Sequence, residues 1–448
     1  MTFVSVIVFS ALVAGCVCSE QLRFPAWFKF GAASAAYQVE GAWNVSDKGL
    51  STWDKSLHDN SSLVRDKSNG DVACDSYRLW RRDVQMCAEL GLDMYRFSIS
   101  WSRLLPTGFP NLISEDGRNY YNNLIDGLLE KGIEPFVTIY HFDLPQDLQD
   151  LGGWANPQII TWFTDYAEVV FSLYADRVKY WVTLNEPFGI CDLGYGGKSA
   201  PFLYSDKVGR YLCNKHVLMA HAKAYRLYEK QFKPQYNGKL SISNIFFWFL
   251  PATPDDQDVT DLTKEYFEGR FGHAIYSKKG GWPPKLEQFL AENSKKEGYP
   301  HPRLPPFTSE EVELVRGTYD FYALNHYTSR VVRKAQPGEE VGEWPYTGSK
   351  ELGIHLDSDP SWNKTAVKWF TVYAEGLRSE LHYLNSTYGV KEIIITENGL
   401  PTSDDGLADT DRIQYYKGYL EQYKVRSLCS KLHRPKQDTD AARIRTLL

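Results

Sequence analysis

Two glutamates, Glu186 and Glu397, each stand at the end of a short apolar run. Glu397 closes the sequence Glu-Ile-Ile-Ile-Thr-Glu and is followed by Asn-Gly, whereas Glu186 closes Val-Thr-Leu-Asn-Glu and is followed by proline. Such runs are typical of strands buried on both faces of a parallel sheet. Each glutamate by itself could be a loop cap. Together, two strand-terminal carboxyls could face each other across a pocket, as hydrolysis of a glycosidic bond requires.

In that reaction a carboxylic acid protonates the departing oxygen, and a carboxylate on the other face of the sugar attacks the anomeric carbon. The acid must be protonated at rest and needs a weakly charged setting, whereas the nucleophile must stay ionised. Arg96 and Tyr327 are suitable groups to keep a nucleophile ionised. Arg96 interrupts an apolar run, and a buried guanidinium is costly unless it is paired, so we expect it to face a carboxylate.

Further polar residues follow other predicted strands. Asn185 can donate its amide to the sugar 2-hydroxyl, a contact that strengthens in the transition state. Gln38, His141 and Asn325 are suited to binding sugar hydroxyls. The alternative for each is a loop residue that satisfies backbone groups. A metal-binding role for His141 is not supported, because no second ligand lies at a useful spacing.

Strand and helix patterns alternate seven times without a linker, which predicts an α/β fold of the (β/α)8 TIM-barrel type with its chemistry at the C-terminal strand ends. A Pro- and Gly-rich excursion interrupts the pattern at 280–307. The expected strands are 28–33, 93–99, 134–140, 178–185, 240–244, 320–324 and 392–397, and the expected helices are 75–90, 120–131, 159–174, 217–232, 263–276, 366–388 and 412–424.

The last 24 residues conflict with this fold. Residues 425–448 are polar and basic and contain no apolar run of strand length. We therefore expect an incomplete barrel in which the eighth strand and helix are absent, although a closed barrel needs them to cover its edge. The predicted division is a signal peptide at 1–19, a barrel domain at 20–424 and an atypical tail at 425–448.

Composition and the first residues indicate the compartment. The chain has 448 residues and a formal net charge of −6, with no basic run that would favour nucleic acid. Residues 3–17 are almost wholly apolar, which predicts a secretory signal, and no other segment approaches the length of a membrane span. We expect a secreted glycoprotein, with sequons at Asn44, Asn60, Asn363 and Asn385.

Five cysteines follow the predicted signal, and their spacing fits no zinc pattern. Cys191 and Cys213 flank one long loop, and we favour a disulfide between them in an oxidising compartment. Cys74 and Cys87 are expected to be buried thiols on the first helix, and Cys429 lies in the atypical tail.

Six segments, in order, resemble glycoside hydrolase family 1 β-glucosidases of the secreted animal type, which includes lactase-like and insect enzymes. They are 30–41, 95–101, 140–146, 183–187, 324–328 and 395–399. The resemblance implies a retaining β-glycosidase without metal or organic cofactor, acting on a β-glucoside or oligosaccharide. It implies that Glu186 is the acid/base and Glu397 the nucleophile beside Arg96. The sugar subsite would be shaped by Gln38, His141, Asn185 and Tyr327.

Three positions bear on what this relationship predicts. Glu186 is a glutamate where plant thioglucosidases of the family carry glutamine, which favours cleavage of O-glycosides. Phe142 stands where the family usually has tryptophan. Nothing after Lys424 matches the family's eighth-strand segment, which supplies a tryptophan and a glutamate to the sugar. The tail therefore resembles an alternative exon, a frameshift or a misassembled gene model, and the alternative function is an impaired or inactive sugar-binding relative.

Overall fold

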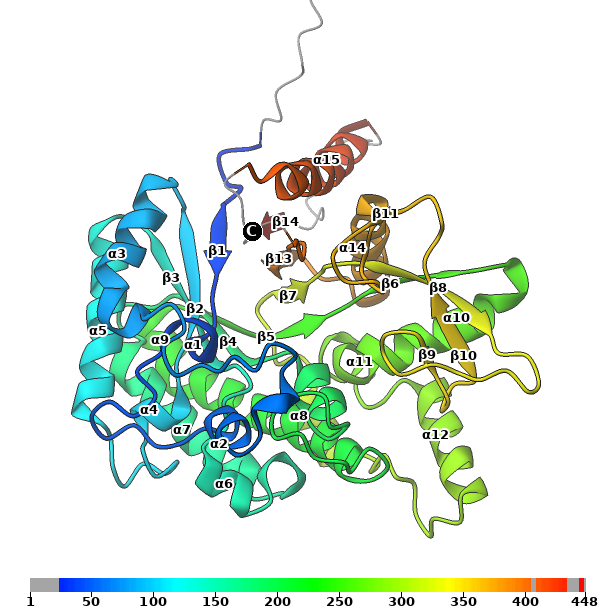
Figure 1. The fold of residues 1–448 in the computed structure, drawn as a ribbon, viewed down its shortest axis with the longest axis horizontal. Coiled ribbons are helices and arrows are strands. Elements are labelled where there is room, and N and C mark those ends of the chain that lie inside the picture. Colours follow the sequence, from blue (N-terminus) through cyan, green and yellow to red (C-terminus); the bar gives the residue numbers. More distant parts are fainter. Residues whose placement is uncertain (1–23, 404–407, 433–442, 447–448) are drawn as a thin grey trace, which may run out of the picture.

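The computed structural model describes residues 24–403, 408–432 and 443–446 (Figure 1). The predicted signal peptide lies outside this range. Eight parallel strands form one sheet whose spatial order equals the chain order. These strands are β1 (Gly31–Ala33), β2 (Met94–Ser98), β3 (Glu134–Tyr140), β4 (Tyr180–Asn185), β5 (Lys239–Ile245), β7 (Tyr322–Asn325), β13 (Glu392–Glu397) and β14 (Arg443–Thr446).

Helices connect successive strands and cover the outside of the sheet (Figure 1). The helix α7 illustrates why: its Phe163, Tyr166 and Val170 recur at helical spacing and are fully buried. The larger connecting helices are α3 (Ser76–Glu89), α5 (Glu115–Glu130), α7 (Ile159–Tyr174), α8 (Gly209–Leu227), α10 (Gln257–Lys264), α11 (Arg270–Tyr276), α12 (Pro284–Lys296), α13 (Ser309–Val315), α14 (Ala374–Tyr388) and α15 (Thr410–Leu432). The remaining α-helices are α1 (Ala36–Val39), α2 (Thr52–Asp59), α4 (Trp101–Leu104), α6 (Gln146–Asp150) and α9 (Lys233–Tyr236).

A second, four-stranded sheet was not predicted. Its order is β6-β8-β10-β9, with β6 (Trp248–Pro251), β8 (Ser329–Lys334), β10 (Ile354–Asp357) and β9 (Gly348–Ser349), and it lies on the side of the barrel away from α3 and α5 (Figure 1). A small hairpin pairs β11 (Asn363–Lys364) with β12 (Thr371–Val372). These strands are two to six residues long and come from distant parts of the chain, so local periodicity alone did not reveal their pairing.

The predicted α/β barrel is confirmed, and its seven recognisable strands occur in the expected order. Two element predictions were wrong in detail. The helix expected over 366–388 begins only at Ala374, because Thr371–Val372 pairs in the hairpin. The excursion at 280–307 contains α12, which starts at Pro284, a residue that the first helical position tolerates.

The seven expected strands form a nearly closed barrel, and a short segment that was not predicted adds to its open edge. The segment Arg443–Thr446 pairs in parallel with β13 over four residues. The physical reason is that an edge strand offers backbone hydrogen bonds to any extended segment, whatever its side chains. Within the described residues no backbone pairing joins β14 to β1, so the barrel is nearly closed.

Alternation along the strands divides the core into two layers. Met94, Phe136, Val182 and Ile394 belong to a small cluster inside the barrel, whereas Ile393 and Ile395, the neighbours of Ile394, belong to the large cluster between strands and helices. The prediction that the strand at 392–397 is buried on both faces is therefore confirmed.

Candidate active site

The two strands that present the glutamates, β13 ending at Glu397 and β4 ending just before Glu186, each carry one extra residue near that end. On β13 the register against β7 shifts between Ile395 and Glu397, and on β4 the register against β5 shifts between Val182 and Asn185. A bulge of this kind re-aims the following side chain. Since Ile394 points inward, strict alternation would direct Glu397 outward. The bulge instead brings it into the cavity at the barrel mouth.

Glu397 is held by two donors from other strands. Arg96 Nη1 donates to its Oε1 at 2.7 Å, and the Tyr327 hydroxyl donates to its Oε2. Burial raises the pKa of this carboxyl, but the positive charge of Arg96 and the hydrogen bond from Tyr327 act against burial, and the net pKa lies below its usual value. Glu397 is therefore ionised at neutral pH.

The surroundings of Glu186 shift its pKa in the opposite direction from that of Glu397. Burial raises its pKa, the negative charge of Glu397 raises it further, and the result is about 8 despite a hydrogen bond from Asn325. That bond runs from Asn325 Nδ2 to Glu186 Oε1 at 2.7 Å. Glu186 also has φ 43°, in the left-handed region, and its backbone N–H donates to Ser243 O at 2.8 Å. A strained backbone that tertiary contacts hold in place is typical of functional sites.

Arg96 is buried beneath the site and donates hydrogen bonds to residues of three other strands. Its side chain is buried, as predicted, and it faces a carboxylate. Its Nε donates to Thr138 Oγ1 at 2.9 Å, its Nη1 also donates to Thr396 O at 3.0 Å, and its Nη2 donates to Asn185 Oδ1 at 2.7 Å. One guanidinium therefore links strands β2, β3, β4 and β13, so the position of Glu397 is tied to that of Asn185.

The hydrogen bonds also determine the tautomer of His141. Asn185 Oδ1 already accepts from Arg96 and from Asn325 Nδ2, so Asn185 Nδ2 donates to His141 Nε2 at 3.1 Å. His141 then carries its proton on Nδ1. Burial lowers the pKa of His141 to about 4, so the ring is neutral at neutral pH and does not compete with Arg96 as a cation.

The two glutamates line one cavity of about 430 Å³. Six predicted residues lie on its wall, namely Gln38, His141, Asn185, Glu186, Tyr327 and Glu397. Arg96 and Asn325 do not; they are buried beneath it, and Asn325 holds Glu186 rather than facing the cavity. Sequence reasoning missed six other wall residues: Ala33, Ser34, Phe142, Ile245, Asn398 and Tyr416. Asn398 could have been recognised from the sequence, because it is polar and directly follows Glu397 at the strand end.

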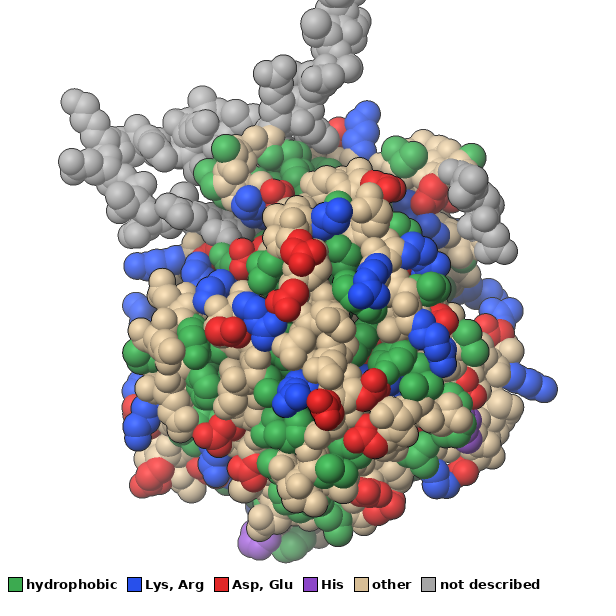
Figure 2. All heavy atoms as spheres, turned by 90° about the vertical axis from the view of Figure 1, so that its left-hand side faces the viewer, with side chains coloured by type: hydrophobic (Ala, Val, Ile, Leu, Met, Phe, Trp, Pro, Cys, Tyr) green, Lys and Arg blue, Asp and Glu red, His purple; other side chains and the backbone are tan. Residues whose placement is uncertain are grey.

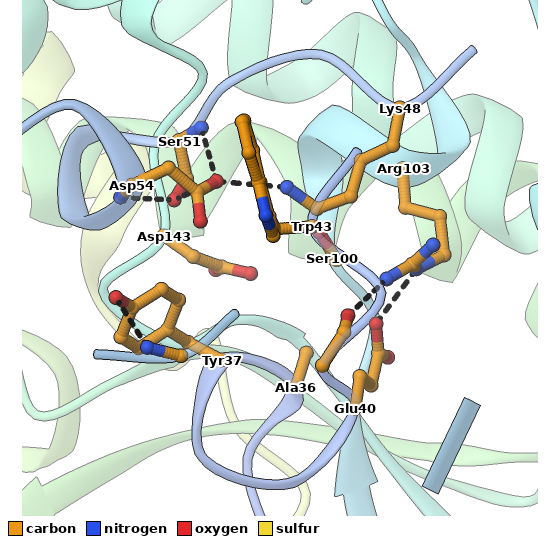
Figure 3. A pocket seen from close by; sticks show the side chains of 12 residues that line it. Ala36, Tyr37, Glu40, Trp43, Lys48, Ser51, Asp54, Ser100, Arg103 and Asp143 are labelled. Atoms are coloured by element: carbon orange, nitrogen blue, oxygen red, sulfur yellow. Dashed lines mark hydrogen bonds and ion pairs between the residues drawn. The ribbon is translucent and has the colours of Figure 1, made fainter. Parts of the chain in front are cut away.

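A buried polar network that includes Glu40, Arg103 and Asp143 surrounds a small void (Figure 3). Glu40, just after α1, accepts from Arg103 Nε at 2.8 Å and from the Tyr121 hydroxyl at 2.7 Å. Asp143 accepts from the His141 backbone N–H at 3.4 Å, and burial raises the pKa of Asp143 to about 7. The void between these residues, about 10 Å³, has room for one water. This network anchors the segments that present Gln38 and His141.

The structure contains the disulfide favoured from the sequence. Cys191 and Cys213 are bonded with Cα atoms 5.5 Å apart, and they join the segment after Glu186 to α8. Of the other two cysteines whose side chains are described, Cys87 is buried on α3 as expected, but Cys74 is exposed and precedes that helix. Cys429 belongs to the part of α15 whose side chains the structure does not describe.

Removal of the disulfide should lower stability without changing the chemistry. A Cys191→Ser, Cys213→Ser double variant releases a link across 22 residues, which corresponds to about 3 kcal/mol of unfolding free energy. Urea unfolding would measure the loss, with the exposed Cys74→Ser as the matched control. An unchanged midpoint under oxidising conditions would contradict the expectation.

Neither a metal cluster nor a membrane-spanning helix is found in the described part of the chain. Among the described residues no group of three His, Cys, Asp or Glu side chains could hold a metal ion, and no helix is long and apolar enough to cross a membrane. On the face that Figure 2 shows, Lys and Arg side chains are interspersed with Asp and Glu.

A parallel α/β barrel with two carboxyls of opposed pKa at its C-terminal mouth is an arrangement suited to glycoside hydrolysis. The chain matches glycosyl hydrolase family 1 over residues 20–429 and belongs to that family. It is 44% identical over 405 residues to Myrosinase 1 of Brevicoryne brassicae, covering 89% of this chain and 85% of the relative. It is 40% identical over 406 residues to the cytosolic β-glucosidase of Homo sapiens, covering 90% and 85%.

Solved structures agree with the sequence relatives. Aphid myrosinase superposes with a TM-score of 0.86 at 40% identity, covering 95% of this chain and 89% of that chain. A rice β-glucosidase superposes with a TM-score of 0.82 at 33% identity, covering 94% and 89%. The chain is thus a glycoside hydrolase of a β-glycosidase family whose members are retaining enzymes.

Proposed function

We propose that this protein hydrolyses β-glucosides by double displacement, with Glu397 as nucleophile and Glu186 as acid/base. The observation that carries the proposal is the opposed electrostatics of the two carboxyls, one kept ionised by Arg96 and the other kept protonated by burial and by its neighbour's charge. A carboxylate nucleophile and a carboxylic acid at one cavity are the two groups that the retaining reaction needs.

In the first step Glu397 attacks the anomeric carbon, the glycosidic C–O bond breaks, and the proton of Glu186 passes to the departing oxygen. In the second step Glu186, now ionised, takes a proton from water, and the resulting hydroxide displaces Glu397 from the sugar. The positive charge of Arg96 stabilises the carboxylate before attack and after release. A rice β-glucosidase of this fold, 33% identical, is known in a covalent complex with glucose, which supports a covalent intermediate.

The hydrogen-bonding groups around the cavity suit the hydroxyls of one glucose unit. Gln38 lies in α1, His141 directly follows β3 and Asn185 ends β4, and all three line the same cavity. The loops 191–213 and 336–361 line a second cavity of about 450 Å³, with Tyr204, Trp344 and Lys198 among its residues. We propose that this space contributes to the choice of aglycone.

An O-glycoside is the preferred substrate in this proposal, because Glu186 can donate a proton that an oxygen leaving group requires. The 44% identity to a protein called myrosinase raises thioglucosides as a second substrate class. Comparing kcat/KM for an aryl O-glucoside and the matching aryl thioglucoside would decide between them. Faster cleavage of the thioglucoside would overturn the preference.

The pH dependence follows from the two carboxyls. Activity needs ionised Glu397 and protonated Glu186, so kcat/KM should fall at low pH as Glu397 gains its proton, below the usual range of a glutamate. It should also fall at high pH as Glu186 loses its proton, near its pKa of about 8. A profile measured on an aryl β-glucoside from pH 3 to 10 tests this. An alkaline limb near pH 5 would contradict the assignment of Glu186 as the proton donor.

A second candidate function is sugar binding without turnover. It is favoured by residues 425–448, which do not match the family's tryptophan- and glutamate-containing segment. Replacing these residues with a family-type segment and assaying both proteins would separate the two functions. Equal activity would remove the binding-only candidate, whereas activity in the hybrid alone would support it.

Secretion is a further part of the proposal. The disulfide, the apolar first residues and the sequons support it, since disulfides persist in oxidising compartments. Asn44, Asn60 and Asn363 are exposed, whereas Asn385 is half-buried and donates its amide to Val390 O. Expression in insect cells followed by deglycosylation of the medium fraction would test it; protein found only inside the cells would count against it.

A further inference from the structure

In the chain, His326 lies between the two residues that donate hydrogen bonds to the catalytic carboxyls. His326 directly follows β7, with Asn325 on one side and Tyr327 on the other. Asn325 donates to Glu186 and Tyr327 donates to Glu397. Any shift of this tripeptide would therefore change the hydrogen bonding of both carboxyls at once.

The backbone of His326 is tied to the nucleophile strand. Its N–H donates to Glu397 O at 3.0 Å, and its carbonyl accepts from Asn398 Nδ2 at 2.6 Å. The next carbonyl, of Tyr327, accepts from the hydroxyls of Tyr415 and Tyr419 on α15. These bonds tie the backbone of the tripeptide to β13 and to α15, and none of them involves α14.

The side chain of His326 makes the connection to the covering helix α14. Its Nδ1 is hydrogen bonded to Glu380 Oε2 at 2.7 Å, and both side chains are fully buried. Among the described residues Glu380 Oε1 has no hydrogen-bond partner, so the Glu380 carboxyl depends on His326, whereas the His326 ring also interacts with the backbone of Phe246. Separation of the pair would leave the buried Glu380 carboxyl and His326 Nδ1 unpaired, so this hydrogen bond holds a precise position.

Burial determines the charge of this pair. It lowers the pKa of His326 to about 3 and raises the pKa of Glu380 well above its usual value. The pair is therefore net neutral near pH 7, which means that it can act on the catalytic carboxyls by position rather than by its own charge.

We propose that Glu380 is a positioning residue that acts through His326 to aim Asn325 at Glu186 and Tyr327 at Glu397. The proposal rests on the proposed roles of these two glutamates. Glu380 lies on α14 and is not among the residues that line the cavity. It therefore affects catalysis indirectly, through its hydrogen bond to His326 and the backbone from Asn325 to Tyr327.

The test is the pH profile of kcat/KM for Glu380→Ala and Glu380→Gln on an aryl β-glucoside, with rates expressed per active site by titration with a slow fluorinated glucoside. Glutamine keeps an oxygen and an amide that can bond to His326, so this variant should behave like the wild type. Alanine leaves His326 Nδ1 without a partner. Because hydrogen bonds from Asn325 and Tyr327 lower the pKa of their carboxylates, loosening them should raise both pKa values.

The alanine variant should therefore show both limbs of the profile displaced to higher pH, with a fall in kcat/KM of up to about 100-fold, as expected for a small misplacement of reacting groups. Glu268 offers a matched control. It is also a buried carboxyl, and it accepts hydrogen bonds from Tyr322 on β7 and from Tyr388 on α14, at 2.7 and 3.1 Å. Glu268→Ala should lower the melting temperature but leave both limbs in place.

Three outcomes distinguish the possibilities. Displaced limbs in Glu380→Ala, restored in Glu380→Gln and absent in Glu268→Ala, support the positioning role. A lower melting temperature with unmoved limbs in both alanine variants overturns it. If Glu380→Ala does not fold, the glutamine variant decides, and a glutamine variant that is also impaired overturns the positioning role. A wild-type protein that does not cleave the glucoside at all contradicts the proposed function itself.

Discussion

Replacing Glu397 with glutamine should reduce hydrolysis of an aryl β-glucoside by at least about 10³-fold, because a neutral amide cannot attack the anomeric carbon or form the glycosyl ester. Binding should survive, since the amide keeps the size of the side chain and its oxygen can still accept from Arg96, while its NH2 group faces the Tyr327 hydroxyl, which can accept. Steady-state rates and equilibrium binding of a glucose-like inhibitor would measure the two effects separately.

The same substitution at the opposite end of the strand is the control. Glu392 begins β13 and pairs with Lys239, far along the strand from the cavity wall. Glu392→Gln should change stability slightly and leave kcat near the wild-type value. Retention of more than a tenth of the activity in Glu397→Gln, or a product with inverted anomeric configuration, would remove Glu397 from the role of nucleophile.

Replacing Glu186 with glutamine should have an effect that depends on the leaving group. An amide donates no proton to the departing oxygen, so an alkyl glucoside, whose alkoxide leaves poorly, should react about 10²–10⁴-fold more slowly. A dinitrophenyl glucoside needs no proton for departure and should still be cleaved in the first step. Its second step should be slow, because no base remains to activate water, so a burst of phenol should precede slow turnover.

The two substrates are internal controls for each other on one protein. The alkaline limb near pH 8 should also disappear from the profile of this variant, because the group that titrates there is gone. An equal loss for both glucosides, or an alkaline limb that persists, would show that Glu186 is not the proton donor.

Much of the barrel could be predicted from the sequence because its signals are local. The run from Glu392 to Glu397 is apolar at three successive positions, and such runs belong to strands covered on both faces. Arg96 could be predicted to face a carboxylate, because a guanidinium inside an apolar run has few other favourable environments. Both inferences need only neighbouring residues, and the structure agrees with both.

The second sheet and the eighth strand could not be predicted in this way. The strands β9 and β10 are short, and their stability depends on partners such as β8 that lie elsewhere in the chain. The strand β14 has no apolar run, and its place follows from the backbone groups that β13 leaves open at the sheet edge. In each case pairing between distant segments outweighs local propensity.

By itself the sequence determined which side chains are available: two strand-terminal carboxyls, one arginine in an apolar run and polar groups at several strand ends. Only the tertiary structure decided how they work. A bulge on β13 turns Glu397 inward where alternation would have turned it outward, and a bulge on β4 precedes Glu186. Arg96 keeps one carboxyl ionised, and burial keeps the other protonated. Orientation and protonation both depend on neighbours that are far away in the chain, and only folding brings those neighbours within hydrogen-bonding distance.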